Sequence, residues 1–223
     1  MTFQSIYRNR SVEYLPSDVD QIQYDALTDV FKLYNPSFGP IQKITTTFGQ
    51  RGGSPCYAGF SDIFNIDQLV QKWVKTPTEL KLKQALFAGG KGGSLSATFL
   101  GSTGEIIERL IGSLPYFKHQ QHLIFGSYDD MIKRGLNAYH PAELTQFANE
   151  QFNESFQFKP FTTKSKITWV KGHHFFSKKD VFLPAQLIFS VYFFRPGEDR
   201  IGYSTSGGLS SHINFKEAFV QSV

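Results

Sequence analysis

The sequence predicts an α+β, or mixed α/β, protein. Segments of strand length that are rich in apolar and β-branched residues alternate irregularly with amphipathic segments of helix length, a pattern typical of this class. The 223 residues are enough for one sizeable core or two small ones. No Pro/Gly/Ser-rich linker divides the chain. We therefore expect residues 1–40 to form an irregular N-terminal segment and residues 41–223 to belong to one domain.

Strands are expected where β-branched or aromatic residues are concentrated between turn residues. These segments are residues 41–48, 56–60, 80–87, 122–125, 167–170 and 181–194. Helices are expected where apolar residues recur three and four positions apart. These segments are residues 24–33 and 66–74, a long helix after the glycines at 89–93, part of 129–151 with Pro141 in a first turn, and a last helix from about Phe215.

Residues 89–114 are the stretch around which the chain is organised. They indicate a glycine-rich turn that holds Lys91, followed by one long helix. At 100° per residue one side of this helix is apolar, while Glu105, Glu108 and Arg109 lie together on the opposite side. The apolar side comprises Phe99, Leu100, Thr103, Gly104, Ile106, Ile107, Leu110, Ile111 and Leu114.

The charged side of this helix has two interpretations. A solvated Glu–Arg pair is the simpler one. A ligand site is favoured by Gly101 and Gly104, since a glycine inside a helix costs about 1 kcal/mol relative to alanine and usually marks close packing or a close approach by a ligand. The backbone N–H groups of the glycine turn, together with Lys91, could also meet an anion.

Composition narrows the function classes. The net charge of +4 comes without a dense Lys/Arg run, so nucleic acid is not an expected partner. The single cysteine, Cys56, excludes an intramolecular disulfide and fits a reducing compartment. The chain has neither a signal-peptide pattern at its start nor an apolar run long enough to span a membrane. We therefore expect a soluble cytoplasmic protein that has no membrane partner.

Several common catalytic motifs are absent from the sequence. The P-loop pattern fails because Ala85 stands where its first glycine belongs, and neither GxGxxG nor GxSxG occurs. His173 and His174 lie together in an expected loop and are only a weak candidate for a metal site. No catalytic residue can be assigned from the sequence.

The last helix has the same design as the long one. A loop of small residues, 203–211, precedes it, and Glu217 and Gln221 lie four positions apart on one face. Oxygen ligands of this kind suit a hard cation such as Mg²⁺. Glu217 also has a structural interpretation, because Asn214 and Glu217 are spaced as a capping box. No helix-stop residue precedes Val223, so we expect the chain to be part of a longer one, with a short fraying helix as the alternative.

These segments resemble the YcaO-like family of ATP-dependent peptide-modifying enzymes. The first motif of that family has the form S-x3-E-x2-E-R. Glu105, Glu108 and Arg109 match it, and Gly101 stands in place of its serine.

The second family motif, S-x6-E-x3-Q, is matched in full by Ser210, Glu217 and Gln221. The resemblance extends from about Gly39 to the last residue, so residues 41–223 would be the N-terminal part of a YcaO-like domain. It implies ATP and Mg²⁺ as cofactors, held in a fold without a P-loop. By that analogy the metal ligands are Glu105, Glu108, Glu217 and Gln221, and the nucleotide contacts are Lys91, Arg109 and Ser210.

The resemblance also implies an activity. The family uses ATP to phosphorylate a backbone amide oxygen in a ribosomally made precursor peptide, and a Cys, Ser or Thr side chain then closes an azoline ring. Thioamide formation by the same ATP chemistry is an alternative. Because no leader-peptide-binding domain is recognisable at the N-terminus, a partner protein is expected to bind the leader.

Two departures from the family leave other functions open. The third motif of the family, E-x3-R, is not found before the last residue, and Gly101 replaces the serine of the first motif. The chain could therefore be a non-catalytic interaction subunit of a peptide-modifying complex. A domain whose Glu/Arg face is merely solvated is the third interpretation.

Overall fold

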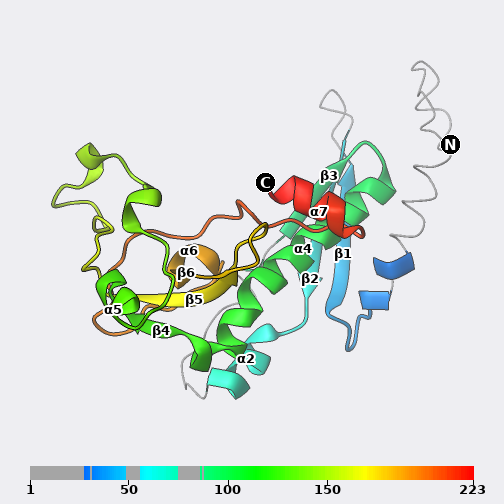
Figure 1. The fold of residues 1–223 in the computed structure, drawn as a ribbon. Coiled ribbons are helices and arrows are strands. Elements are labelled where there is room, and N and C mark those ends of the chain that lie inside the picture. Colours follow the sequence, from blue (N-terminus) through cyan, green and yellow to red (C-terminus); the bar gives the residue numbers. More distant parts are fainter. Residues whose placement is uncertain (1–27, 31, 49–55, 75–85, 87) are drawn as a thin grey trace, which may run out of the picture. The chain divides into compact units, whose positions relative to one another are not determined.

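The computed structural model describes residues 28–30, 32–48, 56–74, 86 and 88–223, which form two compact units (Figure 1). The first unit takes residues from Met1–Phe64 and Gly89–Thr103, and the second from Asn65–Ala88 and Gly104–Val223. Helices accompany two separate three-stranded sheets, which confirms the α+β class. None of the helices in the described ranges is both long and apolar enough to cross a lipid bilayer.

The sheet of the first unit has the order β1-β2-β3. Strand β1 (Ile41–Phe48) agrees with the predicted bounds and pairs antiparallel with β2 (Tyr57–Ile63), which runs three residues further than predicted. The strand predicted at residues 80–87 lies outside the described residues except for Leu86, which is in a turn.

The glycine-rich segment is a strand, β3 (Ala88–Gly92), and the prediction of a turn that holds Lys91 is wrong. A Cβ on Gly90 would lie 2.2 Å from the backbone nitrogen of Ser102. The glycine therefore lets β3 lie directly against α4 (Leu95–Lys118), with no side chain between them. The chain bends only afterwards, at residues 93–94.

The second unit is built on the sheet β4-β5-β6. Strand β5 (Ile167–His173) pairs antiparallel with β4 (Ile124–Gly126) and with β6 (Asp180–Pro184), so the strands predicted from residues 167 and 181 form a hairpin. The strand predicted over 181–194 ends at Pro184, because α6 (Ala185–Ile188) follows it.

Tertiary hydrogen bonds explain this helical turn. The side chain of Gln186 is buried, its amide nitrogen donates to the carbonyl of Asp199, and its amide oxygen accepts from the N–H of Ile201. These two bonds need Gln186 on the inner side of a helical turn, and they outweigh the β-propensity of the segment.

The core of the second unit is centred on Trp169, whose side chain is fully buried. Its indole N–H donates to the carbonyl of Gly126 at 2.9 Å. The other core residues are Met131, Ala138, Ile167, Phe182 and Ile201. The short helices of the second unit are α5 (Tyr128–Lys133), η2 (Gln120–His122), η3 (Pro141–Glu143), which begins at Pro141 as predicted, and η4 (Asn149–Gln151).

Four predicted helices can be compared with the structure. Helix α2 (Ile66–Val74) has the predicted bounds, and α7 (Phe215–Ser222) begins where the last helix is expected. Residues 28–30 and 32–33 of the first predicted helix are helical. Helix α4 passes through Pro115, so it ends later than the sequence indicates.

The buried side of α4 overlaps the predicted apolar side only in part. Ile111 is 65% exposed, whereas Gly112, Ser113 and Tyr116 are buried. The prediction that Ile111 lies on the buried face is therefore wrong. Thr103, Ile106 and Leu110 of the predicted side are buried. Small and polar residues are covered as well, because Ser190 and Leu209 pack against Gly112, on the side of the helix that also carries Glu105.

Candidate functional site

Helix α4 places three of the predicted site residues on one side of two successive turns. Arg109 Nη2 lies 2.5 Å and Arg109 Nε 3.1 Å from Glu105 Oε1. The two side chains are 38% and 32% exposed, so the pair is partly buried rather than fully solvated. A partly buried ion pair is screened less by water than a surface pair. Arg109 is thereby held in one orientation.

Glu108 is the second carboxylate on this helix. Partial burial raises its pKa above the ordinary value of 4.5, the negative charge of Glu105 raises it further, and Arg109 opposes both effects. Two carboxylates and one guanidinium leave an excess of negative charge at this position. The site would therefore gain free energy from a bound cation.

The loop before α7 contacts α4 close to these carboxylates. A Cβ on Gly104 would lie 2.8 Å from the hydroxyl oxygen of Ser211, so Ser211 rests directly on the helix backbone. The neighbouring Ser210 donates its hydroxyl hydrogen to the carbonyl of Ala218 in α7. One pair of adjacent serines therefore links α4, next to Glu105, to α7.

A second glycine of α4 extends this contact. A Cβ on Gly112 would lie 2.8 Å from Ser190 Oγ and 2.9 Å from Leu209 Cδ1, and the N–H of Ser190 donates to the carbonyl of Gly112. The loop thus follows α4 from Gly112 to Gly104. Of the two glycines that the sequence singled out, Gly104 marks close packing, by the chain itself, whereas a Cβ on Gly101 would meet only the Cα of Gly90 at 3.7 Å.

Glu217 does not form the capping box for which its spacing is suited. Asn214 caps α7 by accepting a hydrogen bond from the N–H of Lys216. The N–H of Asn214, which Glu217 would have to bind in a capping box, donates to Nδ1 of His212 instead. The interpretation of Glu217 as a capping-box residue is therefore not supported. Glu217 and Gln221 are both exposed on α7.

The β5–β6 hairpin fixes α7 from another side. The ring of Phe219 stacks on Phe175 with 4.2 Å between the ring centroids. In the same hairpin His173 Nδ1 lies 2.8 Å from a carboxylate oxygen of Asp180, and His174 Nδ1 accepts from the N–H of Ser177. Both histidine side chains therefore make contacts within the hairpin, and these contacts explain the pair without a metal.

The second unit contains six of the seven predicted site residues. They are Glu105, Glu108, Arg109, Ser210, Glu217 and Gln221. Lys91 belongs to the first unit, where it is exposed on β3. Within the described ranges no three His, Cys, Asp or Glu side chains are gathered closely enough to hold a metal ion. Mg²⁺ usually needs only one or two carboxylates, because phosphates and water complete its coordination. The Glu105–Glu108 pair fits that kind of site.

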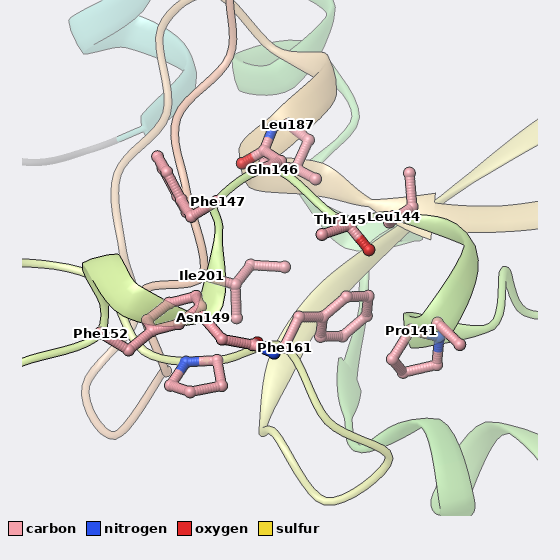
Figure 2. A pocket seen from close by; sticks show the side chains of 12 residues that line it. Pro141, Leu144, Thr145, Gln146, Phe147, Asn149, Phe152, Phe161, Leu187 and Ile201 are labelled. Carbon is pink, nitrogen blue, oxygen red and sulfur yellow. The ribbon is translucent and has the colours of Figure 1, made fainter.

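The second unit also has two hollows that the sequence did not indicate. One, of about 160 Å³, lies among the segment after η3, α6 and the chain around Phe161 (Figure 2). The other, of about 330 Å³, lies beside Phe189 and Ser190. Neither is lined by a predicted site residue. The only sequence signal was an aromatic stretch, residues 152–163, without helix or strand periodicity.

Comparisons with known proteins agree with the fold and the motifs. Residues 89–223 match the family model described as YcaO cyclodehydratase, ATP- and Mg²⁺-binding. A solved heterocyclase in complex with substrate and cofactor is similar over 90% of this chain, with 16% identity and a TM-score of 0.62. YcaO from Methanopyrus kandleri bound with AMPPCP and Mg²⁺ is similar over 94%, with 13% identity and a TM-score of 0.48.

The similarity to the heterocyclase concerns the fold, and this chain covers only part of the length of either solved protein. The chain spans 26% of the heterocyclase and 41% of the Methanopyrus protein. No curated protein sequence matches this chain significantly. The cofactors predicted from the motifs, ATP and Mg²⁺, are those in the description of the matching family.

Proposed function

The chain belongs to the YcaO family, and we propose that it contributes to the Mg²⁺–ATP site of an ATP-dependent peptide cyclodehydratase. The observation that carries this proposal is the serine-linked pair of helices. Glu105 and Glu108 lie on α4, and the loop resting on Gly104 leads into α7, which carries Glu217 and Gln221.

Each predicted residue has a chemical task in this proposal. Glu105 and Glu108, with Glu217 and Gln221 from α7, supply oxygen ligands to Mg²⁺, directly or through water. Arg109, held by Glu105, is oriented to meet a phosphate. Ser210 and Lys91 are the remaining nucleotide contacts. When bound, Mg²⁺ neutralises phosphate charge and so assists phosphoryl transfer.

The proposed substrate is a backbone amide of a ribosomally made precursor peptide. The thiol or hydroxyl of a Cys, Ser or Thr adds to the amide carbon, and the amide oxygen takes the γ-phosphoryl group of ATP. Phosphate then departs with that oxygen, the nitrogen and the attacking group each lose a proton, and an azoline and ADP remain. The chain's share is to position the phosphates and to balance their charge.

The proposal also concerns a partner protein and the cell compartment of the reaction. We propose that a partner protein binds the leader of the peptide and that the reaction takes place in the cytoplasm. The division into an N-terminal segment, residues 1–40, and part of a YcaO-like domain, residues 41–223, stays a prediction.

Nucleotide binding tests the proposal. Affinity for a fluorescent ATP analogue is measured with and without Mg²⁺ for the wild type and for Glu105→Gln, Glu108→Gln and Glu217→Gln. Loss of a charged ligand should weaken Mg²⁺-dependent binding by about tenfold or more. Glu143→Gln is the matched control, since Glu143 is exposed on η3. Equal Mg²⁺-dependent affinity in all variants would refute the proposal.

A non-catalytic interaction subunit is the second candidate. It is favoured by Gly101, which replaces the serine of the first motif and is exposed on α4. The same titration separates the two, because an interaction subunit would show no Mg²⁺-dependent nucleotide binding. The chemistry is separated by mass spectrometry of the product peptide. An azoline former removes the mass of one water, whereas a thioamide former replaces one oxygen by sulfur.

A further inference from the structure

The larger of these two hollows in the second unit has the volume and the lining of a ligand-binding groove. Its volume of about 330 Å³ falls within the usual range of roughly 300–1,000 Å³ for ligand pockets, whereas the hollow in Figure 2 falls below it. Its aromatic lining comprises Phe158, Phe189, Tyr192, Phe194 and Tyr203. We call this hollow the aromatic groove.

The walls of the aromatic groove present ring faces at its rim. The rings of Phe158 and Tyr203 have centroids 5.6 Å apart and are inclined by 36°. Tyr203 is nevertheless 57% exposed, so much of its surface is accessible to a ligand. Aromatic surfaces of this kind gain most from another flat apolar group.

Arg200 is the one charged side chain in the lining of the groove. Its guanidinium carbon lies 4.8 Å from the centre of the Phe194 ring, over which it is stacked. Stacking leaves the edge of the guanidinium, with its N–H donors, free to bind a carboxylate in the plane.

The acidic residues next to Arg200 in the sequence are already engaged. Asp199 uses one carboxylate oxygen for Lys159 Nζ and the other for the N–H of Lys166. Glu198 accepts from the hydroxyl of Tyr192 and from backbone N–H groups. Among the described residues no carboxylate pairs with Arg200, so the groove carries an uncompensated positive charge.

Two other polar side chains of the groove, those of Gln186 and Ser204, bind groups of the protein itself. Both ends of the Gln186 amide bind backbone groups, and the hydroxyl of Ser204 donates to the carbonyl of Phe189 at 2.8 Å. The groove therefore offers a ligand aromatic faces and the guanidinium of Arg200, with the side chains of Gln157 and Ser190 also in its lining.

We propose that the aromatic groove binds one aromatic side chain of the peptide substrate and that Arg200 binds the carboxylate of an acidic residue next to it. This rests on the proposed function, because it assigns part of the peptide specificity. The groove would select substrates by an aromatic–acidic pair.

The position of the groove predicts how far this pair lies from the modified amide. Ser190, in the groove lining, donates its N–H to the carbonyl of Gly112, eight residues along α4 from Gly104. Eight helical residues span about 12 Å, and an extended peptide covers that distance in about four residues. With the activated amide beside Glu105, where the proposed function puts the Mg²⁺–ATP site, the aromatic–acidic pair is expected about four residues from that amide.

Fluorescence anisotropy with short labelled peptides tests the proposal on the full chain. The probe is a Gly/Ser peptide with a central Phe-Asp pair, and the matched peptides carry Phe-Lys or Ala-Asp. We expect the Phe-Asp peptide to bind at least about tenfold more tightly than either, since an Arg–carboxylate pair and a stacked ring are both lost otherwise. Equal binding of the three peptides, or no binding of any, overturns the proposal.

Substitutions locate the binding. Arg200→Met keeps a chain that can pack on Phe194 but removes the charge, so the preference for Asp over Lys should disappear. Tyr203→Ala, at an exposed position, should weaken the Phe-Asp and Phe-Lys peptides alike. Arg134→Met is the matched control, because Arg134 is an exposed arginine after α5. If the preference survives Arg200→Met, the assignment to this groove is wrong.

The peptide assay contains neither Mg²⁺ nor nucleotide, so it is independent of the test of the proposed function. Unchanged Mg²⁺–ATP affinity in the carboxylate variants would refute the proposed function alone. Unchanged peptide preference in Arg200→Met would refute only the peptide site.

Discussion

Ser211 occupies the space that a side chain on Gly104 would need, since a Cβ there would lie 2.8 Å from Ser211 Oγ but 4.0 Å from Ser211 Cβ. The conflict is therefore with the hydroxyl alone. This contact is where the loop that carries the second motif meets the helix that carries the first. The Gly104–Ser211 contact can be tested separately from the side chains proposed to bind Mg²⁺.

A double-mutant cycle measures the Gly104–Ser211 contact. Gly104→Ala alone should give less than the stabilisation of about 1 kcal/mol expected for Gly→Ala in a helix, because Ser211 must turn away. Adding Ser211→Ala removes the conflict and should recover that stabilisation. The measurement is the free energy of unfolding in urea. Additive effects of the two substitutions would show that the contact is absent.

Gly101 is the matched position in the same helix. A Cβ there would meet only the Cα of Gly90 at 3.7 Å, which is ordinary contact. Gly101→Ser should therefore be accepted without loss of stability, and it restores the serine of the first motif. If that serine serves the nucleotide, Mg²⁺–ATP affinity should rise. A marked fall in the thermal midpoint would contradict the contacts around Gly101.

Glu108→Gln should have opposite effects on stability and on cation binding. A carboxyl whose folded-state pKa is raised stabilises the fold below its unfolded pKa, and this contribution is lost as pH rises through the folded pKa. At neutral pH the charge is thus unfavourable, so Glu108→Gln should stabilise slightly, by less than about 1 kcal/mol because water screens a partly exposed group.

The pH profile checks the sign of this effect. The stability difference between Glu108→Gln and wild type should vanish at pH values below the ordinary glutamate pKa of 4.5, where Glu108 is protonated in both states. Mg²⁺ affinity of the wild type should fall as pH is lowered, since the proton competes with the cation. A stability difference that is the same at every pH would exclude a charge effect.

Ser210→Ala removes the hydroxyl that binds the carbonyl of Ala218 in α7. The loss of one hydrogen bond should cost about 0.5–1.5 kcal/mol and loosen α7 first. Hydrogen exchange of the α7 amides is the measurement. Ser204→Ala is the control, since it loses a comparable bond to Phe189. It should cost similar stability without faster exchange in α7.

Phe175→Ala and Phe176→Ala compare two neighbouring rings of the β5–β6 hairpin. Phe175 stacks on Phe219, whereas Phe176 is 83% exposed. Only Phe175→Ala should speed exchange in α7, because it removes the ring on which α7 packs. Phe176→Ala should change stability by less than about 0.5 kcal/mol. Equal effects would mean that the stack does not anchor α7.

Local patterns in the sequence predicted what depends on neighbours within a few residues. The bounds of β1 and α2, the start of α7 and the pairing of Glu105 with Arg109 all follow from periodicity or from a four-residue spacing. The motifs also identified the family, because their residue types and spacing are properties of the sequence itself.

Other features required contacts between distant residues. The glycines at 89–93 indicated a turn, but the structure has a strand there because α4 lies against Gly90. Residues 185–188 indicated a strand, but they form a helical turn in which Gln186 binds Asp199 and Ile201. In both places the backbone conformation depends on contacts with residues that are distant in the sequence.

The sequence by itself therefore determined the class of fold, the family and the spacing of the candidate ligands. Only the tertiary structure decided that Ser211 rests on Gly104, that the N–H of Asn214 binds His212 rather than Glu217, and that Arg200 faces an aromatic groove. Helical spacing places side chains on one face of a helix, but the surface that covers or exposes that face comes from residues far away in the chain.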